Sequence, residues 1–312
     1  MPTEEGAKLS GIAEFLNLKN FTEEMDLSEH YVTTRDVNRP ALQLNGFFEH
    51  FDPGRIQLIG MVEWSYLNNR KTEEERKYIF MKLMSQGQVP AIIFCRGFEP
   101  EPGLLQVARA RNVPLLGTKR GTSEFLAELI YRLRYELAPT ERIHGVMVDV
   151  YGEGLMITGD SGIGKSEAAL ELIRRGHRLV ADDVVELRKI DNHTIIGSSP
   201  DVTKHLIELR GIGIIDVKSL YGVECVEDSQ QLDFVIKLEP WQKEIEYERF
   251  GLNDEYIDIL DTQIVRHSLP IRPGRNLAVI CETAAVNHRQ KKMGYNAAAE
   301  LYRRVQENMI HK

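Results

Sequence analysis

The chain has 312 residues, of which 42% are hydrophobic and 28% are charged, and its formal net charge is −8 at pH 7. This length predicts about two domains, and the balance of apolar and charged residues is typical of globular proteins. The negative charge argues against a general nucleic-acid or membrane-surface binder, and no apolar run reaches the length of a membrane span.

The cysteines and the N-terminus indicate the compartment. Cys95, Cys225 and Cys281 lie far apart among apolar residues and show no C-x-x-C spacing, which predicts free thiols and a reducing cytosol. Met1–Glu5 has neither a basic region nor an apolar run behind it, so we expect no signal peptide and a cytoplasmic location.

The first part of the chain alternates strand and helix signals. Helices are predicted over residues 12–17, from the capping box at Thr72 to about Met84, and from Pro102 to Arg111; strands are predicted over residues 55–60, 89–95 and 113–116. This alternation indicates a small α/β domain. It contains no catalytic constellation.

A longer helix then closes this domain. Thr122 is the expected N-cap, apolar residues follow at helical spacing, and Pro139 stops the helix. We therefore expect an N-terminal α/β domain over residues 1–138, with the helix as connector, and a second domain over residues 139–312.

The second domain begins with an expected hairpin, residues 143–150 followed by 154–158, and an apolar strand over 178–185 carries two adjacent acids. Short β-type runs fill residues 195–236, and a helix is predicted over 276–288. A last helix, capped by Asn296, is expected to turn an apolar face inward; that face comprises Ala298, Leu301, Tyr302, Val305 and Met309.

The hairpin leads into the most specific motif of the chain, G-x-x-x-x-G-K-[ST], with a helical pattern behind it. Its residues are Gly159, Asp160, Ser161, Gly162, Ile163, Gly164, Lys165 and Ser166. Glycines let backbone N–H groups cradle phosphate oxygens, and the helix N-terminus adds partial positive charge. Lys165 can reach the outer phosphates and Ser166 can bind Mg²⁺. The stretch predicts a phosphate site, most simply for a nucleotide.

Other residues are candidates for the same site, each with a plainer alternative. Asp182–Asp183 resembles a Walker-B acid, or is a strand-end turn. His144 shares an expected strand face with three valines, which favours a core histidine. Glu208 is a possible second metal carboxylate or a surface acid. Three arginines, Arg249, Arg272 and Arg275, are candidate cations for a transferring phosphoryl group, or solvated charges.

Taken as a set, these motifs closely resemble the HPr kinase/phosphorylase family. The resemblance rests on Gly159–Ser166, Gly176–Asp183, the run Glu208–Val217 with its Glu-x-Arg-Gly-x-Gly pattern, and Pro270–Ala278, in matching order and spacing. It implies a small N-terminal α/β domain and a C-terminal P-loop kinase domain similar to the nucleotide-binding core of phosphoenolpyruvate carboxykinase.

The resemblance also implies an activity. Members phosphorylate a regulatory serine of the phosphocarrier HPr with ATP or pyrophosphate, and they dephosphorylate serine-phosphorylated HPr by phosphorolysis, which yields pyrophosphate. They control carbon catabolite repression in the cytoplasm, form homohexamers, and respond to fructose bisphosphate and inorganic phosphate.

Residue roles follow from the same resemblance. Asp183 matches the general base, and His144, Lys165 and Arg249 match other catalytic positions. Ser166 and Glu208 match the Mg²⁺ ligands. A loop needed for dephosphorylation matches Pro270, Ile271, Arg272, Pro273, Gly274 and Arg275.

Two other functions stay open from the residues alone. One is a small-molecule or carboxykinase-like kinase on the same core, although an obvious histidine-rich set for a transition metal is absent from the sequence. The other is a nucleotide-dependent switch without a protein acceptor; the base-reading motif N-K-x-D of GTPases is absent, which counts against a GTPase switch.

Overall fold

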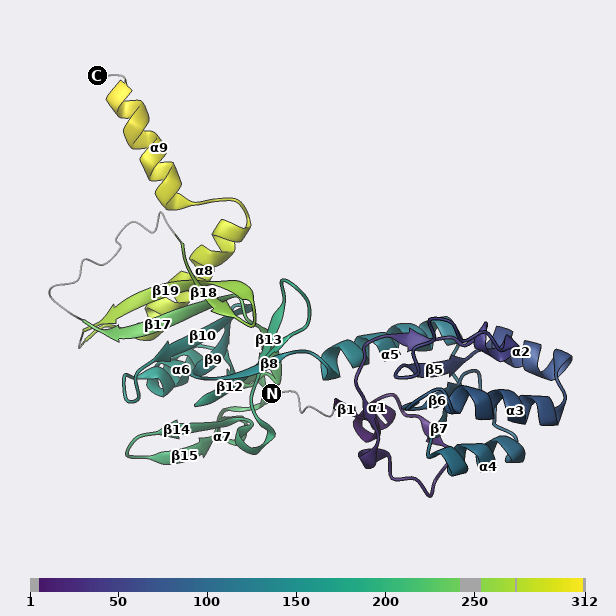
Figure 1. Cartoon of the computed structure of the whole chain (residues 1–312). Coiled ribbons are helices and arrows are strands. Elements are labelled where there is room, and N and C mark those ends of the chain that lie inside the picture. Colours follow the sequence, from purple (N-terminus) through teal and green to yellow (C-terminus); the bar gives the residue numbers. More distant parts are fainter. Residues whose placement is uncertain (1–5, 242–253, 273, 311–312) are drawn as a thin grey trace. The chain divides into compact units, whose positions relative to one another are not determined.

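The computed structural model describes residues 6–241, 254–272 and 274–310. The chain divides into two compact units, Met1–Ala138 and Pro139–Lys312 (Figure 1). No helix among the described residues is long and apolar enough to cross a membrane.

Unit 1 is built on a five-stranded sheet in the order β2-β7-β6-β5-β4, in which β4 to β7 are parallel and β2 is antiparallel. Its elements are β1 (Ala7–Lys8), α1 (Leu9–Phe15), β2 (Lys19–Asn20), η1 (Leu27–Glu29), β3 (Tyr31–Val32), β4 (Val37–Asn38), η2 (Gln43–Asn45), β5 (Ile56–Ile59), α2 (Met61–Arg70), α3 (Glu73–Met84), β6 (Ile92–Phe94), α4 (Pro102–Arg111), β7 (Leu115–Gly117) and α5 (Thr122–Glu136).

The sheet of unit 1 is buried on both faces because its side chains alternate along each strand. On β6, Ile93 packs with α1 and α5, whereas Ile92 and Phe94 pack with α2, α3 and α4. The expected α/β domain is thus confirmed, including both ends of α4 and the capping box that opens α3. Three details were wrong: the helix predicted over residues 12–17 is α1 at Leu9–Phe15, α2 was not predicted, and Gly121 rather than Thr122 is the N-cap of α5.

Unit 2 contains a six-stranded sheet in the order β11-β9-β10-β17-β19-β18 and a four-stranded sheet in the order β16-β13-β12-β8. Its elements are β8 (Thr140–His144), β9 (Val146–Val150), β10 (Glu153–Gly159), α6 (Lys165–Arg174), β11 (Arg178–Ala181), β12 (Val184–Lys189), β13 (Ile195–Ser198), η3 (Asp201–Thr203), β14 (Leu206–Leu209), β15 (Gly213–Asp216), α7 (Val217–Tyr221), η4 (Val223–Cys225), β16 (Ser229–Gln231), β17 (Phe234–Pro240), β18 (Glu255–Ile259), β19 (Thr262–Ile271), α8 (Leu277–Lys292) and α9 (Ala297–Ile310).

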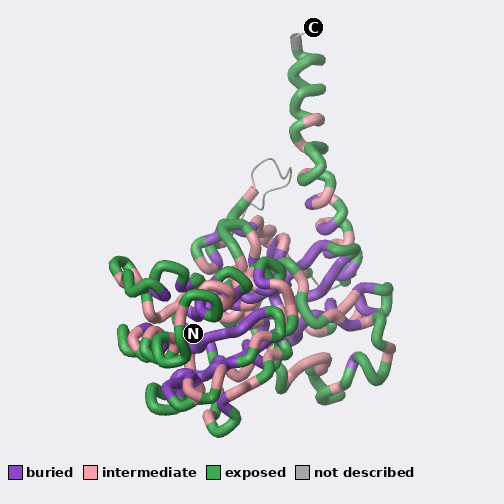
Figure 2. The backbone as a smooth tube through the Cα atoms, turned by 90° about the vertical axis from the view of Figure 1, so that its right-hand side faces the viewer, coloured by how far each residue is buried: buried purple, intermediate pink, exposed green. Residues whose placement is uncertain are grey.

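The six-stranded sheet lies between two layers. Helices α6 and α8 pack on one face through residues such as Val148 and Ile236, and the other face packs on the four-stranded sheet through residues such as Met147 and Val235. The purple stretches in Figure 2 mark buried backbone of this kind. The expected hairpin is confirmed, because β9 pairs antiparallel with β10 directly before the phosphate loop.

The chain switches sheets twice at one place, which the sequence pattern did not reveal. The predicted strand over 143–150 is two strands, β8 and β9, which separate at Gly145 and lie in different sheets. The predicted strand over 178–185 is likewise β11 and β12, separated by Asp182 and Asp183. We call the place where residues 144–146 and 181–184 cross between the two sheets the seam. At the seam, Gly145 N donates to Asp183 O at 3.0 Å. Only glycine fits there, since a Cβ on Gly145 would lie 2.8 Å from Ile157 O.

The last helix also differs from expectation. Asn296 caps α9 as predicted, accepting from Ala298 N and Ala299 N. The face predicted to turn inward is nevertheless exposed: Leu301, Tyr302, Val305 and Met309 are 52%, 55%, 47% and 73% exposed. Figure 2 shows α9 in the exposed colour along most of its length. An amphipathic pattern fixes the apolar side of a helix, but it does not supply the surface that covers that side.

Candidate active site

The phosphate loop connects the end of β10 to the start of α6, as its motif predicts. Gly159, the last residue of β10, has φ +140°, and a Cβ there would lie 2.6 Å from Leu238 O. Gly164 has φ +102° and is the N-cap of α6. The loop therefore turns through backbone conformations that favour glycine, and it presents the N-terminus of a helix to its ligand.

Lys165 and Ser166 are the first residues of α6, and both side chains are engaged. The Lys165 ammonium donates to Gly159 O at 2.9 Å and to Asp160 O at 3.1 Å, so it lies across the loop. The Ser166 hydroxyl donates to Asp182 Oδ1 at 2.9 Å. Both carbonyl partners of the Lys165 ammonium are uncharged, so its positive charge is available to a phosphate.

The two adjacent acids have different environments. Asp182 is 3% exposed and accepts hydrogen bonds from Ser166 Oγ and from Glu208 N, each at 2.9 Å. Burial raises its pKa, although these hydrogen bonds oppose the change. The Asp183 side chain is 71% exposed, and its backbone has φ +66°. The pair is therefore one buried acid that organises the site and one exposed acid that meets solvent.

His144 lies beside the exposed acid and not in the core. It ends β8 opposite Val184 of β12, its side chain is 85% exposed, and Nδ1 lies 3.3 Å from Asp183 O and 3.9 Å from Asp183 Oδ1. The expectation of a shared face with the valines was wrong, because Gly145 ends the strand that carries His144 before the valine strand begins. The seam between the sheets thus places an imidazole next to a carboxylate.

A pocket of about 110 Å³ lies between the phosphate loop and the two adjacent acids. Its lining includes Val146, Ser161, Gly162, Gly164, Lys165, Ser166, Glu167, Asp182, Asp183, Glu208 and Arg210. Glu208 lies on β14, and its side chain is exposed at this pocket. The oxygen atoms of Ser166 and Glu208 suit a hard cation such as Mg²⁺, and the buried Asp182 carboxylate, whose pKa is raised, would gain from such a charge nearby.

Arg210 is a pocket residue that was not among the candidates, although it belongs to the Glu-x-Arg-Gly-x-Gly pattern. Its Nη2 donates to Ser161 Oγ at 2.9 Å, and its guanidinium approaches Gly162 so closely that a Cβ there would lie 2.4 Å from Nη1. The pocket thus holds two cations, Lys165 and Arg210, on the phosphate side. The place of Arg210 in the Glu-x-Arg-Gly-x-Gly pattern was the sequence feature that could have identified it as a site residue.

The remaining candidates fall elsewhere. Arg249 and Pro273 lie outside the described residues. The described residues of the 270–275 loop do not line the pocket; Arg275 Nη1 donates to Pro270 O at 3.1 Å, and Arg272 stacks on Trp241. Pro270 and Ile271 are the last residues of β19, so the predicted loop begins inside this strand, which is separated from β10 by β17 in the parallel part of the sheet.

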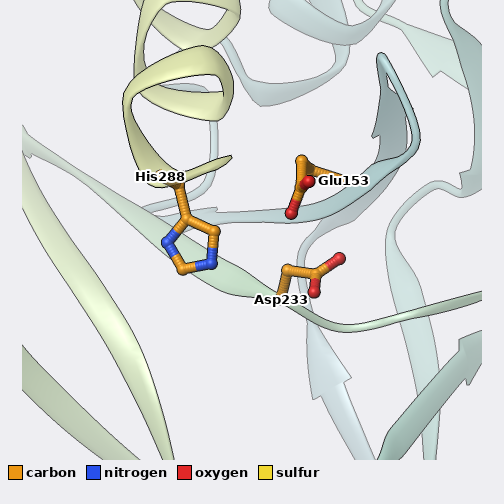
Figure 3. A group of neighbouring side chains, drawn as sticks. All are labelled: Glu153, Asp233 and His288. Atoms are coloured by element: carbon orange, nitrogen blue, oxygen red, sulfur yellow. The ribbon is translucent and has the colours of Figure 1, made fainter. Parts of the chain in front are cut away.

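A second charged cluster lies at the opposite end of β10. Glu153, Asp233 and His288 approach one another within 4.8 Å, a grouping that resembles a metal-ligand set (Figure 3). However, the Lys292 ammonium bridges Glu153 Oε2 and Asp233 Oδ1, each at 2.9 Å, and Arg289 Nε donates to Glu153 Oε1 at 2.9 Å. Two cations already neutralise the two carboxylates, so the cluster fastens α8 to the sheet and offers no metal site.

Together, the fold and the pocket define a P-loop protein equipped for phosphoryl transfer. Comparison with known proteins specifies the family: residues 8–133 match the model described as "HPr Serine kinase N terminus" and residues 135–305 match "HPr Serine kinase C-terminal domain". The chain therefore belongs to the HPr serine kinase family.

Curated relatives agree with this assignment. The chain is 56% identical over 305 residues to the HPr kinase/phosphorylase of Lachnoclostridium phytofermentans, covering 98% of each chain. It is 49% identical over 294 residues to that of Caldicellulosiruptor bescii, covering 94% of each chain. The solved HPr(Ser) kinase/phosphatase of Coxiella burnetii is 37% identical, with a TM-score of 0.46, over 52% of this chain and 98% of that one.

Proposed function

We propose that this chain phosphorylates a serine of HPr and removes the same phosphate by phosphorolysis. Family membership supports HPr as the acceptor. The observation that carries the chemistry is the exposed Asp183 carboxylate in a pocket that also contains Lys165 and Ser166. A hydroxyl on the surface of another protein can reach such a carboxylate, whereas it cannot reach the buried Asp182.

In the forward direction, Asp183 accepts the proton of the serine hydroxyl while the serine oxygen attacks the terminal phosphorus of the donor. A new oxygen–phosphorus bond forms as the bond from phosphorus to the leaving group breaks, which releases ADP from ATP or inorganic phosphate from pyrophosphate. In the reverse direction, an oxygen of inorganic phosphate attacks the phosphoserine, Asp183 returns the proton to the departing serine oxygen, and pyrophosphate forms. One carboxylate serves both directions because a base in one direction is the acid in the other.

The other pocket residues stabilise charge. Lys165 and Arg210 face the phosphoryl oxygens, where the negative charge is distributed during transfer. His144, beside Asp183, helps to orient that carboxylate. Arg249 is proposed as a further cation from the resemblance alone.

Ser166 and Glu208 would hold Mg²⁺, which neutralises phosphate charge when bound. Asp182 keeps the Ser166 hydroxyl and the Glu208 backbone in place through its two hydrogen bonds. This buried acid is therefore a positioning residue for both proposed ligands.

The donor is proposed to be ATP or pyrophosphate. The pocket, at about 110 Å³, is well below the ~300–1,000 Å³ of a typical site for a drug-sized ligand, so it suits phosphate groups more than a whole nucleoside. A site that binds mainly phosphate groups accepts both ATP and pyrophosphate. It also predicts weak discrimination among nucleotide bases.

The cellular role follows the family: cytoplasmic control of carbon catabolite repression, a homohexameric assembly, and opposite responses to fructose bisphosphate and inorganic phosphate. The exposed apolar residues of α9 support an associating chain, because they lack a partner within the described residues of the chain. All three cysteines are free, which is compatible with a reducing compartment.

The test uses the full chain with HPr, Mg²⁺ and either ATP or pyrophosphate. Intact mass spectrometry of HPr should detect the addition of one phosphoryl group on serine. Adding excess phosphate should reverse the shift and release pyrophosphate. A folded chain that leaves HPr unmodified but consumes ATP with small-molecule acceptors would instead support the small-molecule kinase.

A further inference from the structure

Trp241 and Arg272 form a stacked pair at the ends of two neighbouring strands. Trp241 follows β17 and Arg272 follows β19, and Trp241 N donates to Ile271 O at 3.2 Å. The guanidinium carbon of Arg272 lies 3.5 Å from the centroid of the Trp241 ring. This is well within the ~6 Å range in which a cation is attracted to an aromatic face, and tryptophan is the best of the aromatic partners.

The strand register places the pair at the edge of the sheet that carries the phosphate loop. Gly159 of β10 is opposite Leu238 of β17, and Leu238 is opposite Leu269 of β19. All three strands are parallel, so Trp241 and Arg272 each lie three residues beyond this row on the carboxyl side, or about 10 Å along the strand direction. Ligands of open α/β sheets bind outside this edge.

Stacking leaves the hydrogen-bonding edge of Arg272 available. A guanidinium carries its N–H donors in its plane, so an aromatic ring on one face holds the group without using them. The backbone carbonyl of Arg272 accepts from Arg275 N at 3.3 Å, but within the described residues its guanidinium has no carboxylate or hydrogen-bond partner. Its neighbour Arg275 is different, because Nη1 donates to Pro270 O inside the loop. Among the described residues of the loop, Arg272 is thus the cation whose guanidinium is oriented and has its N–H donors available to an anion.

We propose that Trp241 is a positioning residue for phosphorolysis: its ring holds the Arg272 guanidinium edge toward the attacking inorganic phosphate. This inference rests on the proposed function. Free phosphate offers one phosphate group for binding, whereas ATP offers three, so a cation oriented in advance contributes most in this direction. ATP is held by the whole phosphate loop, and phosphorylation by ATP depends less on Arg272.

The first experiment compares Trp241→Ala, Trp241→Phe and Trp241→Leu in the full chain. Trp241→Ala should raise the phosphate KM of phosphorolysis about 3- to 10-fold, within the range of one cation–π contact, with a smaller change in the ATP KM of phosphorylation. Trp241→Phe should recover most of the loss, and Trp241→Leu, which has bulk but no π face, should not. Tyr256→Ala, an exposed aromatic on β18, is the matched control and should leave both reactions unchanged.

A double-mutant cycle with Arg272→Ala tests whether Trp241 acts through Arg272. The double variant should be no worse in phosphorolysis than Arg272→Ala alone. Losses that multiply, or equal performance of Trp241→Phe and Trp241→Leu, would overturn the inference while the proposed function stands. A folded wild-type chain without activity on serine-phosphorylated HPr would overturn the proposed function, and the inference with it.

Discussion

The two ends of β10 carry two charged clusters with opposite designs. At its start, Glu153 is paired with Arg289 and Lys292, and Lys292 also reaches Asp233. At its end, the Lys165 ammonium contacts backbone carbonyls and no carboxylate among the described residues, and the Asp183 carboxylate faces solvent. Charges that satisfy one another hold elements together, and charges that do not are available for a substrate. The contrast separates the stabilising cluster from the candidate catalytic one without reference to any relative.

The largest expected effect is at the catalytic end. Asp183→Asn removes the proton acceptor and donor, so both phosphorylation and phosphorolysis should fall about 10²- to 10⁴-fold, while nucleotide binding is kept. Initial rates on HPr and nucleotide titration measure the two effects. Asp201→Asn, an exposed acid outside the pocket, is the control. Retained turnover by Asp183→Asn would rule out Asp183 as the base.

A substitution in the cluster at the start of β10 should lower the free energy of unfolding and leave catalysis unchanged. Lys292→Met leaves the carboxylates of Glu153 and Asp233, only 7% and 8% exposed, short of a partner. We expect a loss of about 1–3 kcal/mol in the free energy of unfolding; a pair buried on both sides costs more, about 3–5 kcal/mol, but Lys292 is half exposed. Urea unfolding measures this loss.

The control for Lys292→Met is Gln290→Met, a substitution at an exposed position of the same helix, which should leave the free energy of unfolding unchanged. Activity per folded molecule should be unchanged in Lys292→Met. A large catalytic loss with normal stability would erase the distinction between the two ends.

Arg272→Ala should have a smaller, directional effect. Because the attacking phosphate relies on this cation more than ATP does, phosphorolysis should fall roughly tenfold, the equivalent of one charged contact of about 1.4 kcal/mol, and phosphorylation should fall less. Parallel assays of both reactions on the same preparation measure the ratio. Equal losses would argue that the 270–275 loop has no directional role.

The mildest test is acidification. Burial lowers the pKa of His288, so the folded state favours the neutral imidazole. The contribution of His288 to folding stability is therefore present above the ordinary pKa of 6.5 and is lost as pH falls below it. Burial acts to raise the pKa of Glu153, but hydrogen bonds from Arg289 and Lys292 outweigh it and lower that pKa; this contribution is lost only below the ordinary value of 4.5.

Unfolding curves from pH 7.5 to 4 should therefore show stability falling in two stages. His288→Gln should reduce the first stage without removing it, because burial also lowers the pKa of His30 and His267, which titrate in the same range. A variant curve that matches the wild type between pH 7 and 5.5 would contradict the assignment to His288.

Local patterns predicted local structure well. The capping box at Thr72 fixed the start of α3, and the phosphate-loop motif lies between β10 and α6 as expected, with its glycines at positive φ angles that other residues avoid. Family resemblance, and not periodicity, supplied Asp183, His144 and Glu208 as a set. The structure brings all three to one region through contacts between residues far apart in the chain.

The misses share a physical cause. A strand that switches sheets keeps its apolar alternation, so residues 143–150 and 178–185 each have the pattern of one strand. Helix α2 was missed because it follows β5 after the single residue Gly60, which leaves no loop signal between strand and helix. The cluster around Glu153 joins residues more than 130 positions apart, and no local signal in the sequence links them.

The seam between the sheets has a consequence for anyone who would transplant this site into another scaffold. His144 and Asp183 are neighbours because two chain segments cross between sheets side by side, joined by the hydrogen bond from Gly145 to Asp183. Copying the two side chains onto a single continuous sheet would place them without that bond and without the φ of +66° at Asp183. The transferable unit is the double crossing itself, including its glycine.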